Sequence, residues 1–203
     1  MKRHDSRPAG RLRRRGVGTM AAAVALALAG CDSQSSDGDA APPRAAIGQK
    51  PVEETAPDFA FVAYQGEAVL GGKELAFSGI LQQDKPVALN FWAGLCPPCR
   101  LEMPEMQEVY DEYQDRILLL GVDIGPFAGL GSRDDGQALL RELKITYPAG
   151  TTFDAGVPQA YKLLGLPVTV FITPDGAIVK RWTGLLTKAK LIELVQELLA
   201  ASG

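Results

Sequence analysis

The amino-acid sequence predicts an α/β fold with a central mixed β-sheet and helices on both faces. Two features of the chain lead to this prediction. A buried strand at 87–92, a helix at 97–113 and a second buried strand at 117–122 form a β-α-β unit. A β-hairpin at 168–182 and a last helix at 187–201 follow it. This order of elements is typical of a mixed sheet whose two faces are both covered by helices.

The first elements differ in how clearly the sequence marks them. Residues 59–64 alternate weakly between apolar and polar side chains, which indicates an edge strand. Residues 69–82 are ambiguous, although Gly71-Gly72 marks a turn within them. The apolar run at 87–92 suits a buried strand, and its successive side chains are expected on opposite faces. The two sets are Val87, Leu89 and Phe91 on one face, and Ala88, Asn90 and Trp92 on the other.

The later elements follow from apolar spacing and from the positions of proline and glycine. In the helix at 97–113, Pro98 fits the first turn, where no backbone N–H is needed. A second helix is expected at 134–144 and a short one at 156–164. Pro174-Asp175-Gly176 joins the strands of the hairpin. The last helix has an apolar face formed by Leu191, Leu194, Val195, Leu198 and Leu199.

The N-terminus has the features of an export signal. Seven of the first fifteen residues are Lys or Arg, and a short apolar stretch follows at 20–30. A stable transmembrane helix needs about 20 apolar residues, so residues 1–30 are predicted to be a secretory signal peptide. The signal ends in Leu28-Ala29-Gly30-Cys31. These residues resemble the bacterial lipobox, which implies that Cys31 is lipidated. An ordinary cleavage site beside a chance cysteine is the alternative.

The rest of the chain divides at residue 56. Residues 31–56 are rich in Ser, Asp, Ala and Pro, which predicts a disordered linker after the lipidated Cys31. Residues 57–203 are enough for one domain. Without residues 1–30 the chain has 14 basic and 23 acidic side chains, a net charge of about −9. A nucleic-acid partner is therefore not expected, because binding to phosphates favours a basic face.

Histidine and cysteine usage excludes several kinds of site. The single histidine, His4, lies in the predicted signal peptide. The mature chain therefore lacks His-ligated metals and hydrolase sites of the Ser-His or Cys-His type. If Cys31 is lipidated, Cys96 and Cys99 are the only remaining thiols. Two thiols without histidine cannot complete a four-ligand zinc site, so neither a metal nor another cofactor is expected.

A Cys-x-x-Cys pair lies where a buried strand runs into a helix, in the sequence Trp-Ala-Gly-Leu-Cys-Pro-Pro-Cys-Arg at 92–100. The helix N-terminus carries partial positive charge and free N–H groups, which favour a thiolate on Cys96 near neutral pH. Cys96 is expected to be exposed, and Cys99, one turn further on, to be buried. Such a pair can perform thiol–disulfide exchange. A purely structural disulfide is the alternative, although so short a loop would stabilise the fold little.

Several motifs together match a known family. Residues 89–93 read Leu-Asn-Phe-Trp-Ala, residues 96–104 read Cys-Pro-Pro-Cys-Arg-Leu-Glu-Met-Pro, and Gly165-Leu166-Pro167 precedes the hairpin. The chain resembles the thioredoxin-like TlpA/ResA family of extracytoplasmic thiol–disulfide oxidoreductases, which are often tethered to a membrane. The resemblance covers nearly all of residues 57–200. It implies a thioredoxin-like domain at 57–203 with an extra strand-helix insertion between Gly121 and Gly150.

The resemblance also implies roles for individual residues. Cys96 would attack a partner disulfide, and Cys99 would resolve the mixed disulfide. Glu102 would assist proton transfer at the cysteines; the alternative is an exposed helix carboxylate. Pro167 would have a cis peptide bond beside the disulfide, and the Leu166 backbone would pair with an extended substrate. The alternative for Pro167 is a plain proline at the start of a strand.

Other residues near the cysteines are expected to shape the substrate-binding surface. Pro97 and Pro98 stiffen the loop between the cysteines. Leu95 keeps an apolar rim beside Cys96, although the family usually has Trp there. Trp92 is a candidate for lining the same surface, with a core position as the alternative. Asn90 stands where thioredoxins carry a buried Asp and cannot accept a proton, so proton handling is expected to move to Glu102 or to water.

The sequence therefore predicts a lipid-anchored thiol–disulfide oxidoreductase outside the cytoplasmic membrane, on the periplasmic side if the cell has two membranes. By resemblance, its substrates would be disulfides of secreted proteins, apocytochrome c among them. A membrane thiol carrier would supply the electrons, which favours the reductase direction. A thiol peroxidase of the redoxin type is one alternative, disfavoured because no Thr lies three residues before Cys96. A non-enzymatic binding module with a structural disulfide is the other.

Overall fold

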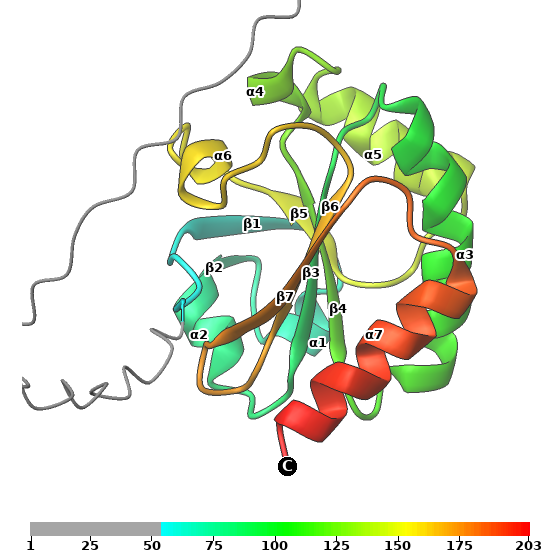
Figure 1. The fold of residues 1–203 in the computed structure, drawn as a ribbon. Helices are drawn as coiled ribbons and strands as arrows, with labels where there is room; N and C mark the ends of the chain where they lie inside the picture. Colours follow the sequence, from blue (N-terminus) through cyan, green and yellow to red (C-terminus); the bar gives the residue numbers. More distant parts are fainter. Residues whose placement is uncertain (1–53) are drawn as a thin grey trace, which may run out of the picture. The chain divides into compact units, whose positions relative to one another are not determined.

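The computed structural model describes residues 54–203 as a seven-stranded sheet with helices on both faces (Figure 1). The strand order is β2-β1-β5-β4-β3-β6-β7. Strands β3, β4 and β5 run parallel to one another, and every other pair is antiparallel. The strands are β1 (Ala60–Gln65), β2 (Glu74–Ala76), β3 (Val87–Trp92), β4 (Leu118–Asp123), β5 (Ala149–Thr151), β6 (Val168–Ile172) and β7 (Ile178–Thr183).

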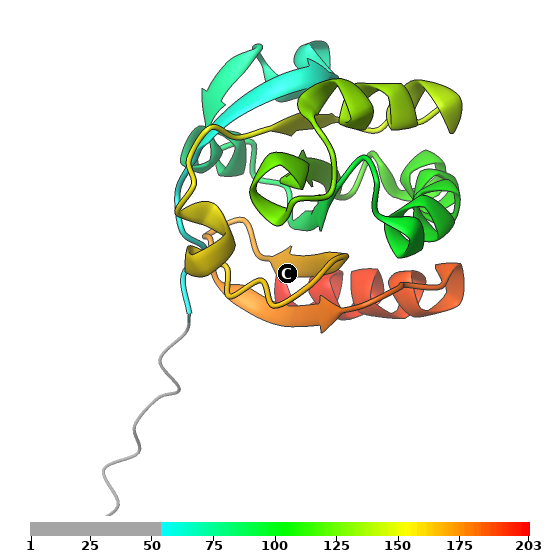
Figure 2. The same ribbon diagram turned by 90° about the horizontal axis from the view of Figure 1, so that it is seen from above.

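Each face of the sheet packs against its own set of helices (Figure 2). Ala88 and Trp92 of β3 share a core with α3, α5 and α7, whereas Val87, Leu89 and Phe91 share a second core with α1, α2 and α6. The predicted division of the β3 side chains is therefore confirmed. The helices are α1 (Glu67–Leu70), α2 (Phe77–Leu81), α3 (Pro97–Tyr113), α4 (Gly125–Ala128), α5 (Arg133–Glu142), α6 (Val157–Ala160) and α7 (Lys188–Ala201).

The predicted α/β class is confirmed, and most elements lie within a few residues of their predicted bounds. Strand β3 and helix α3 match them fully. The segment between Gly121 and Gly150 contains α4, α5 and the start of β5, as the predicted insertion requires. The prediction that 59–64 forms an edge strand is wrong, because β1 lies between β2 and β5. Both neighbours have only three residues, too few to show a hydrophobic period.

The described chain starts before the predicted domain boundary. Thr55 forms an antiparallel bridge with Ala177, and the Ala56 N–H donates to the Gly176 carbonyl at 2.9 Å. Glu54 pairs with Lys162 and Arg181. Residues 54–56, which the sequence assigns to the linker, therefore belong to the folded chain. The predicted signal peptide, Cys31 and the linker as far as residue 53 lie outside the described residues.

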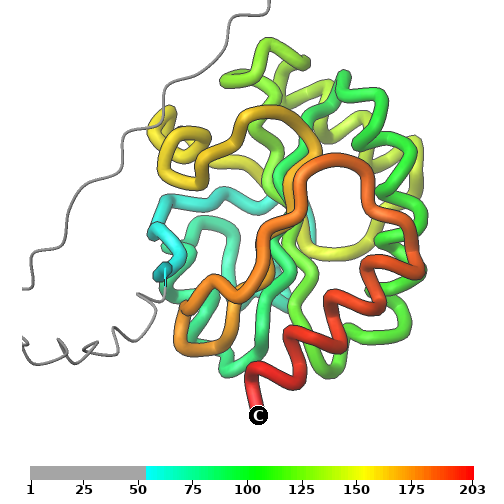
Figure 3. The backbone as a smooth tube through the Cα atoms, in the orientation of Figure 1, coloured from blue at the N-terminus to red at the C-terminus, as the bar shows by residue number. Residues whose placement is uncertain are grey.

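The chain path places residues 93–96, the loop that contains Cys96, at one end of the central strand β3 (Figure 3). All six residues of β3 are buried, and the strand runs through residues 93–96 directly into α3. On the antiparallel neighbour β6, the register places Val168 beside Phe91. Residues just before β6 therefore reach the same end of the sheet as the start of α3. Within residues 54–203, no helix is both long and apolar enough to cross a membrane.

The substitution Gly150→Ala tests the close approach of β1 and β5. A Cβ atom at Gly150 would lie 2.2 Å from the Val62 carbonyl oxygen and 2.6 Å from Cζ of Phe61, so the strands would have to separate. We expect urea unfolding to show a loss of about 1–3 kcal/mol in the free energy of unfolding. Gly79→Ala in α2, where the added Cβ meets open space, is the control and should gain up to about 1 kcal/mol. Equal effects would contradict this packing.

Candidate active site

The two predicted redox cysteines form a disulfide across the first turn of α3. The S–S distance is 2.08 Å and the Cα–Cα distance is 5.3 Å. Cys96 is the N-cap residue, and its sulfur accepts a hydrogen bond from the Cys99 N–H at 3.3 Å. Pro97 and Pro98 occupy the first two helical positions, where the missing N–H groups leave no helical bond unmade. The helix therefore begins at the cysteine pair and directs its N-terminal end toward it.

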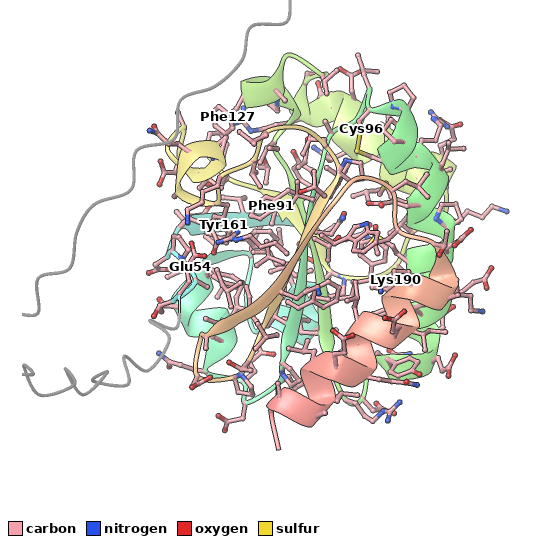
Figure 4. The ribbon with its side chains drawn as sticks, in the orientation of Figure 1. Glu54, Phe91, Cys96, Phe127, Tyr161 and Lys190 are labelled. Atoms are coloured by element: carbon pink, nitrogen blue, oxygen red, sulfur yellow. A yellow bond between two sulfur atoms is a disulfide. The ribbon has the colours of Figure 1, made fainter. Side chains whose placement is uncertain are left out.

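The two sulfurs differ in their access to the surface. Cys99 is fully buried, as predicted. Cys96 was expected to be exposed, which is wrong for the disulfide form, because only 3% of its surface is accessible. It reaches solvent through a depression of about 230 Å³ that it shares with Leu95, Pro97 and Arg100. Figure 4 shows Cys96 at the end of the sheet where α3 begins. A partner can therefore approach the pair only from the Cys96 side.

The loop before Cys96 is held by the segment that precedes and starts α5. The Leu95 N–H donates to the Leu130 carbonyl at 2.9 Å. A Cβ atom at Gly94 would lie 2.5 Å from the Gly136 nitrogen, so only glycine allows α5 to approach so closely. Leu95 itself projects outward and is 60% exposed. The predicted apolar rim beside Cys96 is therefore present, and its backbone is held by contacts with Leu130 and with the start of α5.

Glu102 is buried behind the disulfide, so the alternative of an exposed helix carboxylate is wrong. Its Oε1 accepts a hydrogen bond from Nδ2 of Asn90 at 2.9 Å, and its Oε2 accepts one from the Leu186 N–H at 2.9 Å. The Asn90 amide also donates to Oγ1 of Thr169 at 3.0 Å. One carboxyl group therefore connects α3 to β3 and to the segment before α7, and Asn90 extends the connection to β6.

Burial raises the pKa of Glu102 to about 7, and the hydrogen bonds from Leu186 and Asn90 offset only part of this rise. The carboxyl group is therefore close to half protonated at neutral pH. It lies one helical turn after Cys99, so it is suited to accept and return a proton there. Asn90 cannot take that role, and its Oδ1 atom is buried without a hydrogen-bond partner among the described residues.

The peptide bond between Leu166 and Pro167 is cis, as predicted. Pro167 is buried, and Leu166 is partly exposed. Leu166 also lines a groove of about 270 Å³, together with Phe127 of α4 and Leu130. Leu130 bonds to the backbone of Leu95, so the groove lies next to the loop that carries Cys96. An apolar surface therefore continues from the cysteine pair to the residues before Pro167.

The other predicted surface residues divide between surface and core. Pro97 is exposed and Pro98 is partly exposed. Trp92 was a candidate for lining the surface, and this is wrong, because its side chain is fully buried in the core that also contains Cys99. Trp92 points to the face of β3 that α3 covers, as strand alternation requires. Its Nε1 atom has no hydrogen-bond partner in the part of the chain that the structure describes.

Two groups in the hydrogen-bond network around Glu102 were not predicted from the sequence. Thr169 is the second residue of β6, and its position in an otherwise apolar strand was the available signal. The Leu186 N–H gave no signal, because a backbone donor in a loop carries no sequence pattern. No group of three or more His, Cys, Asp or Glu side chains among residues 54–203 is arranged to hold a metal ion.

The substitution Glu102→Gln tests the raised pKa through stability. Folding favours the protonated carboxyl group, so the stabilisation is full below about pH 4.5 and is lost as the pH rises to about 7. Gln cannot ionise, so the free energy of unfolding of the variant, relative to the natural protein, should rise by up to about 3 kcal/mol between pH 4.5 and pH 8. Urea unfolding of the oxidised proteins at several pH values measures this difference.

The matched control is Glu112→Gln, which removes an exposed carboxylate from the same helix. Its stability relative to the natural protein should change little over this pH range. A difference for Glu102→Gln that stays constant from pH 4.5 to pH 8 would contradict the raised pKa.

Sequence comparisons place the chain among known thiol–disulfide proteins. The model of the AhpC/TSA family matches residues 52–181. The thiol-disulfide oxidoreductase ResA of Oceanobacillus iheyensis is 36% identical over 109 residues, which cover 54% of this chain and 55% of that protein. ResA of Geobacillus thermodenitrificans is 32% identical over 138 residues, which cover 68% of this chain and 72% of that protein. The matches span 55% to 64% of the length of the first three curated relatives.

The solved structures agree with the fold. The crystal structure of the pneumococcal exposed lipoprotein thioredoxin Etrx1 from Streptococcus pneumoniae superposes with a TM-score of 0.58 at 24% identity. The superposition covers 70% of this chain and 99% of Etrx1. The AhpC/TSA family model matches well over half of the chain, and both curated relatives are named ResA. The protein therefore belongs to the AhpC/TSA family and is a thioredoxin-like relative of the ResA proteins.

Proposed function

We propose that the protein is a protein disulfide oxidoreductase whose redox centre is the Cys96–Cys99 pair. The observation that carries this proposal is a cysteine pair in the first turn of α3, with only the N-cap cysteine reaching the surface. The ResA names of the relatives agree with it. The reaction needs no cofactor, because the two sulfurs carry both electrons.

In the reductive direction, the Cys96 thiolate attacks one sulfur of a partner disulfide. The partner S–S bond breaks, its other sulfur leaves as a thiolate, and a mixed disulfide forms at Cys96. Cys99 then attacks the Cys96 sulfur, which releases the second partner sulfur and forms the Cys96–Cys99 disulfide. The partner gains two electrons and takes up two protons as its thiolates protonate. The protein loses two electrons: Cys96 gave up its proton when it formed the thiolate, and Cys99 gives up its own as it attacks.

Glu102 is proposed to handle the proton of Cys99. Cys99 is fully buried, so its thiol cannot release a proton directly to bulk water. Glu102 lies one turn along the same helix with a pKa of about 7, and its ionised form can accept that proton as Cys99 attacks. The Leu186 N–H and the Asn90 amide hold the carboxyl group in place without competing for the proton.

The substrate is proposed to bind as an extended segment across the end of the sheet. The Leu166 backbone, beside the cis bond to Pro167, would pair with the segment as an added strand. Leu95 and Pro97 would contact it beside Cys96, and the groove at Leu166 and Leu130 would take an apolar side chain. Peptide pairing gives affinity for any extended chain, whereas the apolar contacts select among chains.

The partners and location are proposed from the sequence. The basic and apolar leader at 1–30 and the lipobox-like Cys31 support export and a lipid anchor on the outer side of the cytoplasmic membrane. Secreted proteins with disulfides, including apocytochrome c, would then be the substrates. A membrane thiol carrier would return electrons to the Cys96–Cys99 pair, so that the protein acts as a reductase.

A thiol peroxidase is the second candidate, because the family model that matches residues 52–181 is that of the AhpC/TSA family. The site favours disulfide exchange. Ala93, not Thr, lies three residues before Cys96, and the resolving Cys99 is one turn away in the same helix.

The substitution Cys99→Ser tests the order of the two attacks. Without Cys99 the mixed disulfide cannot be resolved, so a disulfide-bonded model substrate such as insulin should stay covalently bound to Cys96. Non-reducing electrophoresis and mass spectrometry should show the conjugate with Cys99→Ser and little of it with Cys96→Ser. Consumption of hydrogen peroxide by the reduced protein should be slow beside its reduction of insulin. Absence of the conjugate, or rapid peroxide consumption, would oppose the proposal.

A further inference from the structure

A third surface depression lies where β1 and β5 meet α5, and it shares no residue with the two near the cysteine pair. We call it the β1–α5 pocket. It has a volume of about 260 Å³, which suits a small ligand or one side chain and is below the size of a drug-like site. Its walls include Tyr64, Lys73, Arg133, Gln137, Thr151 and Phe153.

The pocket contains two cations and no carboxylate in its walls. Within residues 54–203, neither Lys73 nor Arg133 takes part in an ion pair. The Lys73 side chain is exposed. The chain as a whole is acidic, yet two cations without an ion pair among the described residues lie in this one depression. They create a local positive potential that would attract an anion.

Arg133 is held in a fixed position at the pocket. Its guanidinium carbon lies 3.9 Å from the ring centroid of Phe153, which is 64% exposed. Its Nη2 atom donates to the Thr152 carbonyl at 3.2 Å, and its Nε–H is buried without a partner among the described residues. Stacking and one hydrogen bond therefore orient a planar group that still has unused donors. Such a preorganised fork matches the two oxygens of a carboxylate.

The groups around the pocket favour a singly charged ligand. Tyr64, in the pocket wall, donates through its hydroxyl to Oδ2 of the buried Asp123 at 3.0 Å. Burial raises the pKa of Asp123 to about 6, although the charge of Arg133 lowers it. Asp123 is therefore mostly ionised at pH 7.5. An ionised Asp123 behind the wall therefore offsets part of the positive potential of Arg133 and Lys73. A carboxylate, with one charge, fits this balance better than a phosphate dianion does.

We propose that the β1–α5 pocket binds a carboxylate group, with Arg133 and Lys73 as its charged contacts and the Gln137 amide as a neutral one. Gln137 lies one helical turn after Arg133, so both side chains project from the same side of α5. The carboxylate comes either from a free small acid or from an Asp or Glu side chain of a polypeptide. The proposed carboxylate site does not depend on the proposed redox function, so the two proposals are tested separately.

The test is a titration of the full chain, followed by ¹⁵N–¹H NMR at pH 7.5 and constant ionic strength. The probes are propionate, a blocked glutamate-containing tripeptide and inorganic phosphate. Both carboxylate probes should give saturable shifts of the Arg133 Nε–H and of the Thr152 and Phe153 amides, with phosphate binding more weakly. Tighter binding of the tripeptide would assign the ligand to a polypeptide, and tighter or equal binding of propionate would assign it to a free acid.

The variants Arg133→Gln and Lys73→Gln should each weaken carboxylate binding at least tenfold. Lys180→Gln, which removes an exposed lysine from β7, is the matched control and should bind as the natural protein does. If Arg133→Gln does not fold, Lys73→Gln still tests carboxylate binding, because Lys73 is exposed. Shifts that do not saturate, equal affinity in Lys73→Gln, or phosphate binding tighter than both carboxylate probes would overturn the proposal.

Discussion

The buried carboxyl group of Glu102 connects the elements that surround the cysteine pair. It lies on α3 and accepts hydrogen bonds from Asn90 on β3 and from the Leu186 N–H before α7. Burial of an ionised carboxylate costs free energy that hydrogen bonds repay only in part. The protein therefore connects α3 to β3 and to the segment before α7 through a group whose charge changes near neutral pH.

Helix α3 contains both the cysteine pair and the carboxyl group proposed to handle the proton of Cys99. The first turn of α3 contains both sulfurs, and the Cys99 N–H already points at the Cys96 sulfur. When the disulfide is reduced, this donor and the partial positive charge of the helix N-terminus are in place to stabilise a Cys96 thiolate. Glu102, one turn further on, is the group that we propose accepts the proton of the buried Cys99.

Local sequence patterns predicted the elements whose structure is determined by residues close together in the chain. Strand β3, helix α3 and the burial of Cys99 follow from an apolar run, two prolines and helical spacing. Strands β2 and β5 have three residues each, so pairing with β1 defines them and periodicity cannot. The burial of Trp92 and the low exposure of Cys96 depend on how α3 and α5 pack around the loop. The Leu186 N–H reaches Glu102 from 84 residues away, a contact that only tertiary structure creates.

A redox titration of the Cys96–Cys99 pair in glutathione or dithiothreitol buffers, repeated from pH 5 to pH 9, tests most directly whether Glu102 takes part in the redox chemistry of the pair. Each proton taken up with the electron pair changes the reduction potential by about 30 mV per pH unit. We expect reversible equilibration in the natural protein. Because a Cys99 thiolate beside Glu102 would raise the pKa of that carboxyl group above its value of about 7 in the disulfide form, we also expect a change of slope above pH 7, which Glu102→Gln removes. A pair that cannot be reduced in the folded protein, or identical slopes in the two proteins, would contradict these expectations.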